Sequence, residues 1–267
     1  MKKKLISIIA AGILGVQAFA IPMMASAEES VQYVSNSDFN DVSIGGANGT
    51  GYHGLGIIID GSPWLSKGSA SVHYQTFCYD EERGVNYCNF WTNSDKTGSS
   101  DGAGSMYFYN RNLESANQMG PYGLVEFDVR MKSDSQNFNF MMGWFEDPTS
   151  SGFNSATDVA LNVVFSLDGI TANNGVRTAN VATISADKWY KVRVTIDNNL
   201  EEYNVVITDV DTGKVVGSLT DAGYQSSIPS GITGIKTTCW GYIRNNTYDF
   251  DMTNVTIAKS DTKYSVQ

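Results

Sequence analysis

Hydrophobic and polar residues alternate along most of the chain, and the alternation is clearest between residues 188 and 218. Tyr190, Val192, Val194 and Ile196 occupy every second position, with polar or charged residues between them. The pattern pauses at "DNNLEE", resumes, and stops again at "DVDTGK". A period of two predicts β-strands that have one apolar face and one solvated face.

The same period recurs in other segments, and no segment shows a clear helical period. It is found in "VEFDVRMK", "NFNFMMGW", "DVALNVVFSLDG", "GIKTTCWGYI" and "YDFDMTNVTIAK". The connecting segments are rich in Gly, Asn, Asp and Ser, which tolerate the backbone angles of turns. Many short strands with frequent turns predict an all-β protein, specifically an antiparallel sandwich or barrel. No repeat or linker divides residues 28–267, so we expect one domain there.

Residues 45–110 have a different composition, rich in glycine and aromatic residues. The stretches "GGANGTGYHGLG" and "GSPWLSKGS" illustrate it. Regular strands do not require so many glycines, so we expect long loops here, separated by short strands such as "GIIID" and "SMYFYN".

The first 27 residues have the organisation of a secretory signal peptide. Three lysines precede an apolar run that ends near Ala20, and a small-residue "ASA" site follows at residues 25–27. This order predicts export and cleavage before Glu28. A retained membrane anchor is the alternative, but Pro22 and the cleavage site argue against it. No later run is long and apolar enough to span a bilayer, which predicts a secreted protein without membrane insertion.

The charge balance bears on the class of partner. The chain has 18 basic and 28 acidic residues, a net charge of −10. Cleavage would remove three of the lysines, which leaves 15 basic residues and a net charge of −13. Such an excess repels phosphate backbones, so we expect no nucleic-acid partner.

The three cysteines are Cys78, Cys88 and Cys239. The first two flank a polar centre in "CYDEERGVNYC", as the two arms of a hairpin would. Because export permits oxidation, we predict a Cys78–Cys88 disulfide across that hairpin. The alternative is three free thiols buried as small hydrophobic groups. No zinc-ligand spacing occurs.

The order of the segments resembles the concanavalin A-like jelly rolls, which include laminin-G-like domains, bacterial glucanases and jelly-roll polysaccharide lyases. The resemblance is carried by "PYGLVEFDVRMKSDSQNFNFMMGWFED", by the later "DKWYKVRVTID" and by the closing "YDFDMTNVTI". The opening "SNSDFNDVS" is similar to a first strand that pairs near the last one. The resemblance implies a concanavalin A-like sandwich, a fold that hosts many unrelated activities.

The glucanase signature of this family is absent. Retaining glycoside hydrolysis requires two carboxylates about 5–5.5 Å apart, supplied in such enzymes by an E-x-D-x-x-E strand. Here Glu126 and Asp128 are followed by Met131 in place of the second glutamate. Their parity places both acids on a wet face, so we expect them to be solvated.

Lyase chemistry lacks its sequence signature as well. Jelly-roll lyases use Tyr or His as a base and Arg or Lys to neutralise the acid group of the substrate. Those residue types are present as His53, His73, Tyr107, Tyr109 and Arg111, but the R-[ST]-E-[LV]-R and Q-I-H strands of the lyases are missing. Lyase activity stays open as an alternative, because general-base work depends on geometry. We expect a protein without catalytic activity.

Aromatic residues are the conspicuous candidates for binding. The chain has 5 Trp, 14 Tyr and 12 Phe, many of which we assign to the core. Rings with polar edges that fall outside the core pattern suit both sugar faces and protein hot spots. The ligand-binding candidates, with two neighbouring basic residues, are Trp64, Tyr79, Tyr87, Trp91, Tyr107, Tyr109, Arg111 and Arg244. The alternative is that most of these rings cover the sandwich beneath the loops.

Calcium is the one cofactor to consider. "DVDTG" at residues 209–213 has the opening of a calcium loop but lacks a distal bidentate acid, so we interpret it as a turn. The resemblance implies a structural calcium near the paired end strands, with Asp38, Asp249 and Asp251 as candidate ligands.

The pattern as a whole favours recognition of an extracellular glycan or glycoprotein. An adhesin-like or immunoglobulin-binding protein that grips a host protein with a sheet face or edge is the second hypothesis. A jelly-roll polysaccharide lyase is the third.

Overall fold

The computed structural model describes the backbone of residues 32–37, 39, 55–58, 64–68, 73–92, 106–110, 119–144, 158–242 and 248–267. Within these ranges the chain forms sixteen β-strands and no α-helix. The strands are β1 (Gln32–Ser37), β2 (Leu55–Ile58), β3 (Trp64–Gly68), β4 (His73–Asp80), β5 (Val85–Thr92), β6 (Met106–Asn110), β7 (Tyr122–Met131), β8 (Asn137–Gly143), β9 (Val159–Ser166), β10 (Ile170–Asn174), β11 (Arg177–Ala182), β12 (Trp189–Asp197), β13 (Glu202–Asp209), β14 (Val215–Gly223), β15 (Thr237–Tyr242) and β16 (Asp249–Ser260).

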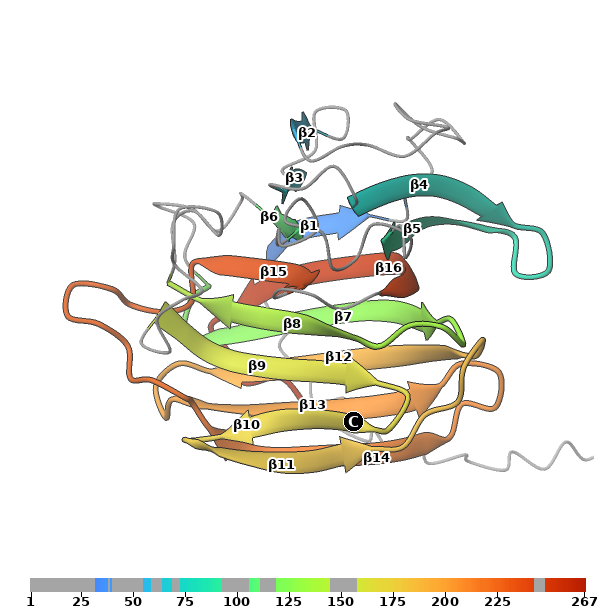
Figure 1. Ribbon diagram of the computed structural model, residues 1–267. Helices are drawn as coiled ribbons and strands as arrows, with labels where there is room; N and C mark the ends of the chain where they lie inside the picture. The colour runs from blue at the N-terminus through green and yellow to red at the C-terminus, as the bar shows by residue number, and fades with distance from the viewer. Residues whose placement is uncertain are drawn as a thin grey trace, which may run out of the picture.

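The strands form two antiparallel sheets stacked face to face (Figure 1). Sheet A has the order β14-β13-β12-β7-β16-β5-β4, and β1 also pairs with β16. Sheet B has the order β11-β10-β9-β8-β15-β6-β3-β2. Runs of consecutive strands stay in one sheet, β8 to β11 in sheet B and β12 to β14 in sheet A, and the chain crosses between the sheets at points such as β7 to β8. The all-β sandwich predicted from the period of two is confirmed.

Alternation places the apolar side chains of both sheets in one layer. The side chains of Phe127, Phe140, Phe165 and Trp240 are at most 1% exposed and come from both sheets. The ring of Phe127 lies 5.1 Å from Phe140, 6.0 Å from Phe165 and 5.4 Å from Trp240, measured between centroids. Such tilted and edge-on contacts add to the free energy gained by burying the rings. Phe127, Phe140 and Phe165 each occupy an alternate, apolar position of their strands.

Residues 45–110 contain more regular structure than a set of loops. Five strands, β2 to β6, lie within this range, and β4 and β5 are eight residues long each. They pair as a hairpin whose four-residue connection ends at Gly84, with a φ of +67° that glycine adopts without strain.

The predicted Cys78–Cys88 disulfide is wrong, although the hairpin itself is present. Cys78 pairs with Tyr87 and Cys88 pairs with Phe77, so the two cysteines are offset by one residue and point to opposite faces. Cys88 is buried in the core, Cys78 is half-buried on the other face, and Cys239 is buried. All three are free thiols. The four-residue connection pairs each odd-numbered residue of one strand with an even-numbered residue of the other. Residues 78 and 88 are both even-numbered, so their side chains point to opposite faces.

The "DVDTG" segment forms the turn between β13 and β14, as predicted. Asp209 Oδ1 accepts hydrogen bonds from the backbone N–H and the hydroxyl of Thr212, both at 2.8 Å. Gly213 completes the turn with a φ of +67°. The carboxylate therefore serves turn geometry.

Truncation of the central ring tests the packing. We expect Phe127→Ala to lower the free energy of unfolding by about 3–5 kcal/mol, because the substitution leaves a cavity between three aromatic rings. Urea denaturation followed by tryptophan fluorescence measures the change. Val176→Ala, at an exposed turn, is the matched control; equal effects of the two substitutions would contradict the described core.

The cysteine assignment has its own test. Alkylation of the unfolded, unreduced protein should modify Cys78, Cys88 and Cys239, and reduction beforehand should not increase the number of modified sites. A Cys78–Cys88 crosslinked peptide in the mass spectrum would contradict the strand register.

Candidate functional site

The outer face of sheet B, over β8 to β11, is covered by amide and hydroxyl side chains. The strand register aligns Asn139, Val164, Thr171 and Asn180 in one row across the four strands. Neighbouring strands are about 4.8 Å apart, so the row is about 14 Å long. By strand parity the outward side chains also include Met141 of β8, which is buried. We call the following outward side chains of these strands the amide face: Asn137, Asn139, Asn162, Val164, Ser166, Thr171, Asn173, Thr178 and Asn180.

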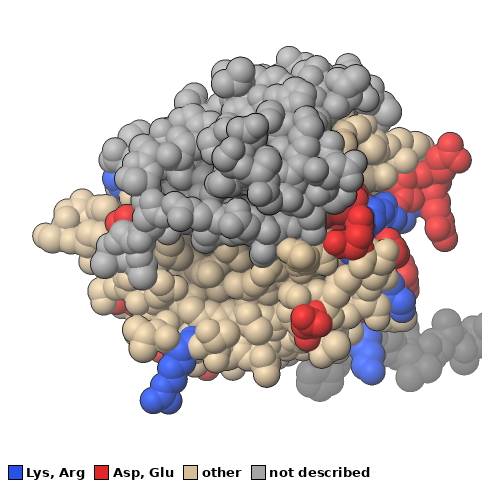
Figure 2. Space-filling model, in the orientation of Figure 1, with Lys and Arg blue, Asp and Glu red and all other residues tan. Residues whose placement is uncertain are grey.

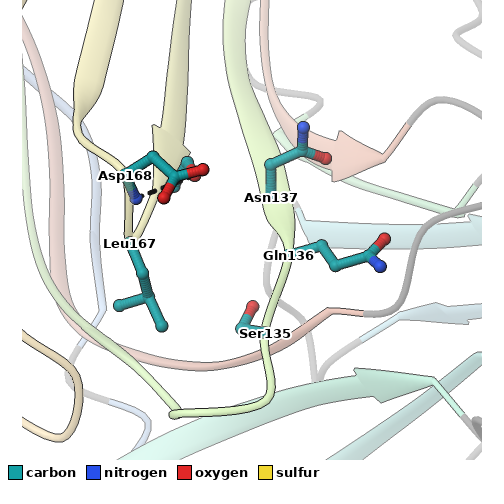
Figure 3. A pocket seen from close by; sticks show the side chains of 6 residues that line it. Ser135, Gln136, Asn137, Leu167 and Asp168 are labelled. Atoms are coloured by element: carbon teal, nitrogen blue, oxygen red, sulfur yellow. Dashed lines mark hydrogen bonds between the residues drawn. The ribbon is translucent and has the colours of Figure 1, made fainter.

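Two depressions lie at opposite ends of the amide face. The loop depression, of about 400 Å³, is formed where the β7–β8 connection meets the β9–β10 turn (Figure 3). Asn137 and Gln136 lie on one side of it and Leu167 and Asp168 on the other. The hairpin depression, of about 340 Å³, is lined by Asn162, Val164, Thr171, Ala172, Asn173, Gly175, Val176, Arg177, Thr178 and Gln225.

Asn173 is a structural member of this face. Its Oδ1 accepts the backbone N–H of Asn162 at 2.6 Å, and its Nδ2 donates to the carbonyl of Gly223 at 3.3 Å. The hydroxyl of Tyr203 donates to the backbone carbonyl of Asn173. These bonds connect β9, β10 and the end of β14, and they hold the floor of the hairpin depression in one geometry.

Some of the other polar groups of the amide face are not used internally. Within the described residues the side chains of Asn139, Thr171 and Asn180 have no hydrogen-bond partner, and neither has the buried Oδ1 of Asn162. A row of amides and a hydroxyl can both donate and accept hydrogen bonds. It therefore matches a ligand whose surface also does both.

Charge is sparse on this face. Figure 2 views the outer side of sheet B, and its lower part, over β9 to β11, is almost free of acidic and basic residues. Among the residues that line the two depressions, Asp168 and Arg177 are the charged ones, and they line different depressions. The chain as a whole carries a net charge of −10.

The outer face of sheet A has the opposite character, because the β4–β5 hairpin curls over it. Four strand-to-strand steps separate β4 from β12, about 19 Å in a flat sheet. Yet Trp189 Nε1, on β12, donates a hydrogen bond of 3.3 Å to Asp80 Oδ2 at the end of β4. The hairpin therefore covers part of the face that the sheet would otherwise expose.

Arginine and aromatic side chains fill the space beneath the hairpin. The guanidinium of Arg130 lies 4.6 Å from the ring centroid of Trp189 and 5.3 Å from that of Tyr87. Arg83, in the hairpin turn, lies 4.7 Å from the Trp189 centroid. Arg130 Nε also donates to Asp251 Oδ2 at 2.7 Å. Cation–π contacts and ion pairs thus use the charges of this cluster internally.

Asp128 is buried, which corrects the prediction that it is solvated. Its side chain is 3% exposed, and its Oδ2 accepts hydrogen bonds from Arg83 Nη2 and Asn254 Nδ2, both at 2.9 Å. Asn254 reaches it because a β-bulge in β16 gives that residue a φ of +51°. Glu126 pairs with Arg193 at 2.7 Å. The alternating pattern correctly predicted that both acids lie on the outer face of the strand. The tip of the β4–β5 hairpin, however, covers Asp128 and excludes solvent from it.

The C-terminal segment, residues 261–267, covers another part of the outer face of sheet A. Tyr264 is 7% exposed and packs against Leu124 and Ala258. Arg193 Nη2 donates to the carbonyl of Ser265 at 3.2 Å, and Lys263 pairs with Asp197 at 3.1 Å. Hairpin and tail together leave little of this face over β7 and β12 for a ligand.

Two of the predicted aromatic candidates lie beside this cluster. Tyr87 and Trp91 occupy alternate positions on the outer side of β5, with Asn89 between them, and both rings are partly buried. Tyr87 contacts Trp189 edge-on at 5.9 Å, and Trp91 Nε1 donates to Thr76 at 3.4 Å. The rings take part in packing here, which was the structural alternative for these residues.

Asp249 and Asp251 share the amide of Asn89. Asn89 Nδ2 donates to Asp249 Oδ1 at 2.7 Å and to Asp251 Oδ1 at 2.9 Å. Asp251 Oδ2 is also paired with Arg130 and with Lys132, so cations of the protein already neutralise it. No group of three or more acidic, His or Cys residues in the described ranges is arranged to hold a metal ion. Asp38, the third predicted calcium ligand, lies outside those ranges.

The remaining predicted site residues are dispersed. Tyr79 is 51% exposed and pairs with Asn86, on the opposite side of the hairpin from Tyr87. The backbones of Trp64, Tyr107 and Tyr109 lie in neighbouring strands β3 and β6 of sheet B. Arg111 and Arg244 lie outside the described residues.

The amide face was missed in the sequence, although its signal was present. In "NFNF" the residues Asn137 and Asn139 alternate with Phe138 and Phe140, so the period that assigns the phenylalanines to the core assigns the asparagines to the outer face. A search weighted towards aromatic rings passed over them.

No family model and no curated protein matches this chain.

Structure comparison aligns this chain with several solved proteins. A carbohydrate esterase, vb_24B_21 from the Shiga toxin-encoding bacteriophage phi24B, aligns with a TM-score of 0.51 and 11% identity over 86% of this chain and 100% of its own. Arcelin-5, a lectin-like defence protein from Phaseolus vulgaris, gives a TM-score of 0.46 and 9% identity over 76% of this chain and 94% of its own. A Lotus tetragonolobus seed lectin gives a TM-score of 0.45 and 12% identity, over 79% of this chain and 100% of its own.

A sialidase also aligns, at a TM-score of 0.44 and 13% identity, over 77% of this chain, which spans 22% of the sialidase. At such identities the matches bear on the fold alone. The order of the strands in the two sheets confirms the predicted all-β antiparallel sandwich. Within the described ranges, no helix has the length and apolar character needed to cross a membrane.

The Asp249 carboxyl gives a pH prediction. Partial burial, with Asp251 and Asp134 nearby, raises the pKa of Asp249 from 3.8 to about 6. The folded protein therefore favours the protonated form of Asp249 more than the unfolded chain does. The resulting contribution to the stability of the fold is fully present below pH 3.8 and is lost as the pH rises through about 6. We expect Asp249→Asn to raise the free energy of unfolding at pH 7.5 by about 1 kcal/mol, a value reduced for solvent screening. Denaturant titrations of both proteins at pH 4.5 and 7.5 measure the difference in the free energy of unfolding. If this free energy changes with pH equally in the two proteins, the raised pKa of Asp249 is contradicted.

Proposed function

We propose that this protein binds glycans through the amide face and does not chemically transform them. The observation that carries the proposal is the row Asn139, Val164, Thr171 and Asn180, in which three polar side chains without partners in the described residues flank one apolar side chain. Sugar rings present hydroxyl groups around their edge and C–H groups on their faces. Amides and hydroxyls satisfy the former, and an apolar side chain packs against the latter.

The rigidity of the face supports the same proposal. The hydrogen bonds of Asn173 and Tyr203 fix the hairpin depression before any ligand arrives. A preformed site loses less entropy on binding, which matters for ligands held by individually weak hydrogen bonds.

We propose that the protein does not hydrolyse glycans because its candidate acidic residues are engaged in ion pairs. Glu126 and Asp128, the acids at the glucanase-like positions, are each ion-paired to arginine. Carboxylate oxygens that are already engaged by arginine are not free to contact a glycosidic bond. The lyase alternative rests on five residues. Two of them, His53 and Arg111, lie outside the described residues, and only the backbone is described for His73, Tyr107 and Tyr109. A rise in ultraviolet absorbance on uronate polysaccharides would support it.

We further propose that the protein acts outside the cell, after removal of residues 1–27, as a single domain spanning residues 28–267. The signal-like N-terminus motivates both parts of this proposal. The partner would then be an extracellular glycan or glycoprotein. Immunoglobulin or another host protein remains the alternative, and a complex that survives deglycosylation of its target would favour it.

Substitutions in the row test glycan binding. We expect the double variant Asn139→Ala/Asn180→Ala to bind its glycan roughly 5- to 100-fold more weakly, the loss expected for two hydrogen bonds. A panel of immobilised glycans identifies the ligand, and calorimetry on the best one measures the affinity.

The matched control is Asn199→Ala, in the exposed β12–β13 turn, which should bind like the unchanged protein. If Trp91→Ala abolishes binding and the double variant does not, the site lies on sheet A and the proposal for the amide face is wrong. Failure to bind any glycan would reject the function itself.

A further inference from the structure

The two depressions of the amide face are joined by one continuous strand. Ser166, at the end of β9, lines the loop depression, and Asn162, four residues earlier, lines the hairpin depression. Four residues of extended chain span about 13 Å. Val164 lies between them and is also the β9 member of the row. A ligand that occupied both depressions would therefore cross the row along β9 and β10.

The side chains between the two depressions indicate whether the ligand carries a charge. Between the depressions the outward side chains are Val, Thr and Asn, and none carries a charge. An acidic sugar lying there would give up water without gaining a cation, and a basic one would gain no carboxylate. Asp168 and Arg177 stand at the two ends, one acidic and one basic, so the ends do not favour either sign.

The shape of the face argues against a protein partner. Protein hot spots centre on large aromatic residues or arginine in desolvated pockets. Within the described part of sheet B the outward residues over β8 to β11 include no aromatic ring, and the exposed Val176 stands at a turn. A surface of short amides and hydroxyls instead fits a ligand with repeated, closely spaced hydroxyl groups.

We infer that the ligand is an uncharged polysaccharide chain, bound along β9 and β10 with its sugar rings reaching from the loop depression to the hairpin depression. The inference rests on the proposed glycan-binding function and narrows it to neutral, extended chains. Asn139, Thr171 and Asn180 bind the middle of the chain, Gln136 and Asn137 bind one end, and Thr178 and Gln225 bind the other.

A length series of oligosaccharides tests the inference. The probes are neutral gluco-, manno- and xylo-oligosaccharides of one to six residues, together with galacturonate oligomers of the same lengths. For at least one neutral series we expect affinity to rise at least tenfold with length and then level off once the chain spans both depressions. The galacturonate oligomers should bind at least tenfold more weakly than the neutral series at equal length.

Substitutions at the two ends locate the chain. Gln136→Ala and Thr178→Ala, both at exposed positions, should each weaken binding of the longest oligomer several-fold and leave the shortest bound oligomer unchanged. Asn139→Lys/Asn180→Lys should gain salt-sensitive binding of galacturonate oligomers, whereas Asn199→Lys should not. Circular dichroism and thermal unfolding verify that each variant is folded.

The outcomes separate the inference from the function. Preference for galacturonate, or affinity that does not depend on length, would overturn the neutral-chain inference while glycan binding stands. If no oligosaccharide of either kind and no glycan of the wider panel binds, both fail. Length dependence that persists in both end variants would place the chain elsewhere on the protein.

Discussion

The rest of this structure depends on the burial of one apolar face of each strand between the two sheets. Phe127 of sheet A meets Phe140, Phe165 and Trp240 of sheet B in a layer that excludes water. Burial of such rings is the main favourable term in folding, and it fixes the register of every strand that contributes one. A shift of one residue would exchange the two faces of a strand. The composition of the outer faces is therefore a direct consequence of how the core is packed.

The two outer faces are used in different ways. On sheet A the β4–β5 hairpin and the C-terminal segment fold back over the sheet, and the charges beneath them pair with one another. Arg130 illustrates this, because it contacts Trp189 and Tyr87 and forms an ion pair with Asp251. Charged groups removed from water need such partners, and a cluster that has them is costly to open for a ligand. On sheet B the outward side chains of Asn139, Thr171 and Asn180 remain unused within the described residues.

This contrast is the reason why we propose that recognition takes place on sheet B. Binding exchanges hydrogen bonds with water for hydrogen bonds with a ligand, and the exchange is favourable when the groups of the protein are already oriented and not otherwise engaged. Asn173 supplies the orientation by holding β9, β10 and the end of β14 together. The neighbouring residues of the row supply the free groups. The aromatic and acidic residues of sheet A, more conspicuous in the sequence, are committed to internal contacts.

The sequence by itself determined the period of two, and with it the sandwich, the core rings and the outward parity of Glu126, Asp128, Asn137 and Asn139. These follow from local geometry, because successive side chains of a strand point to opposite faces. Only the tertiary structure decided which outward residues meet water. The burial of Asp128 depends on a hairpin that begins about fifty residues earlier, and the separation of Cys78 from Cys88 depends on the length of one connection. Alternation reports the face on which a side chain lies, whereas contacts between distant segments decide what covers that face.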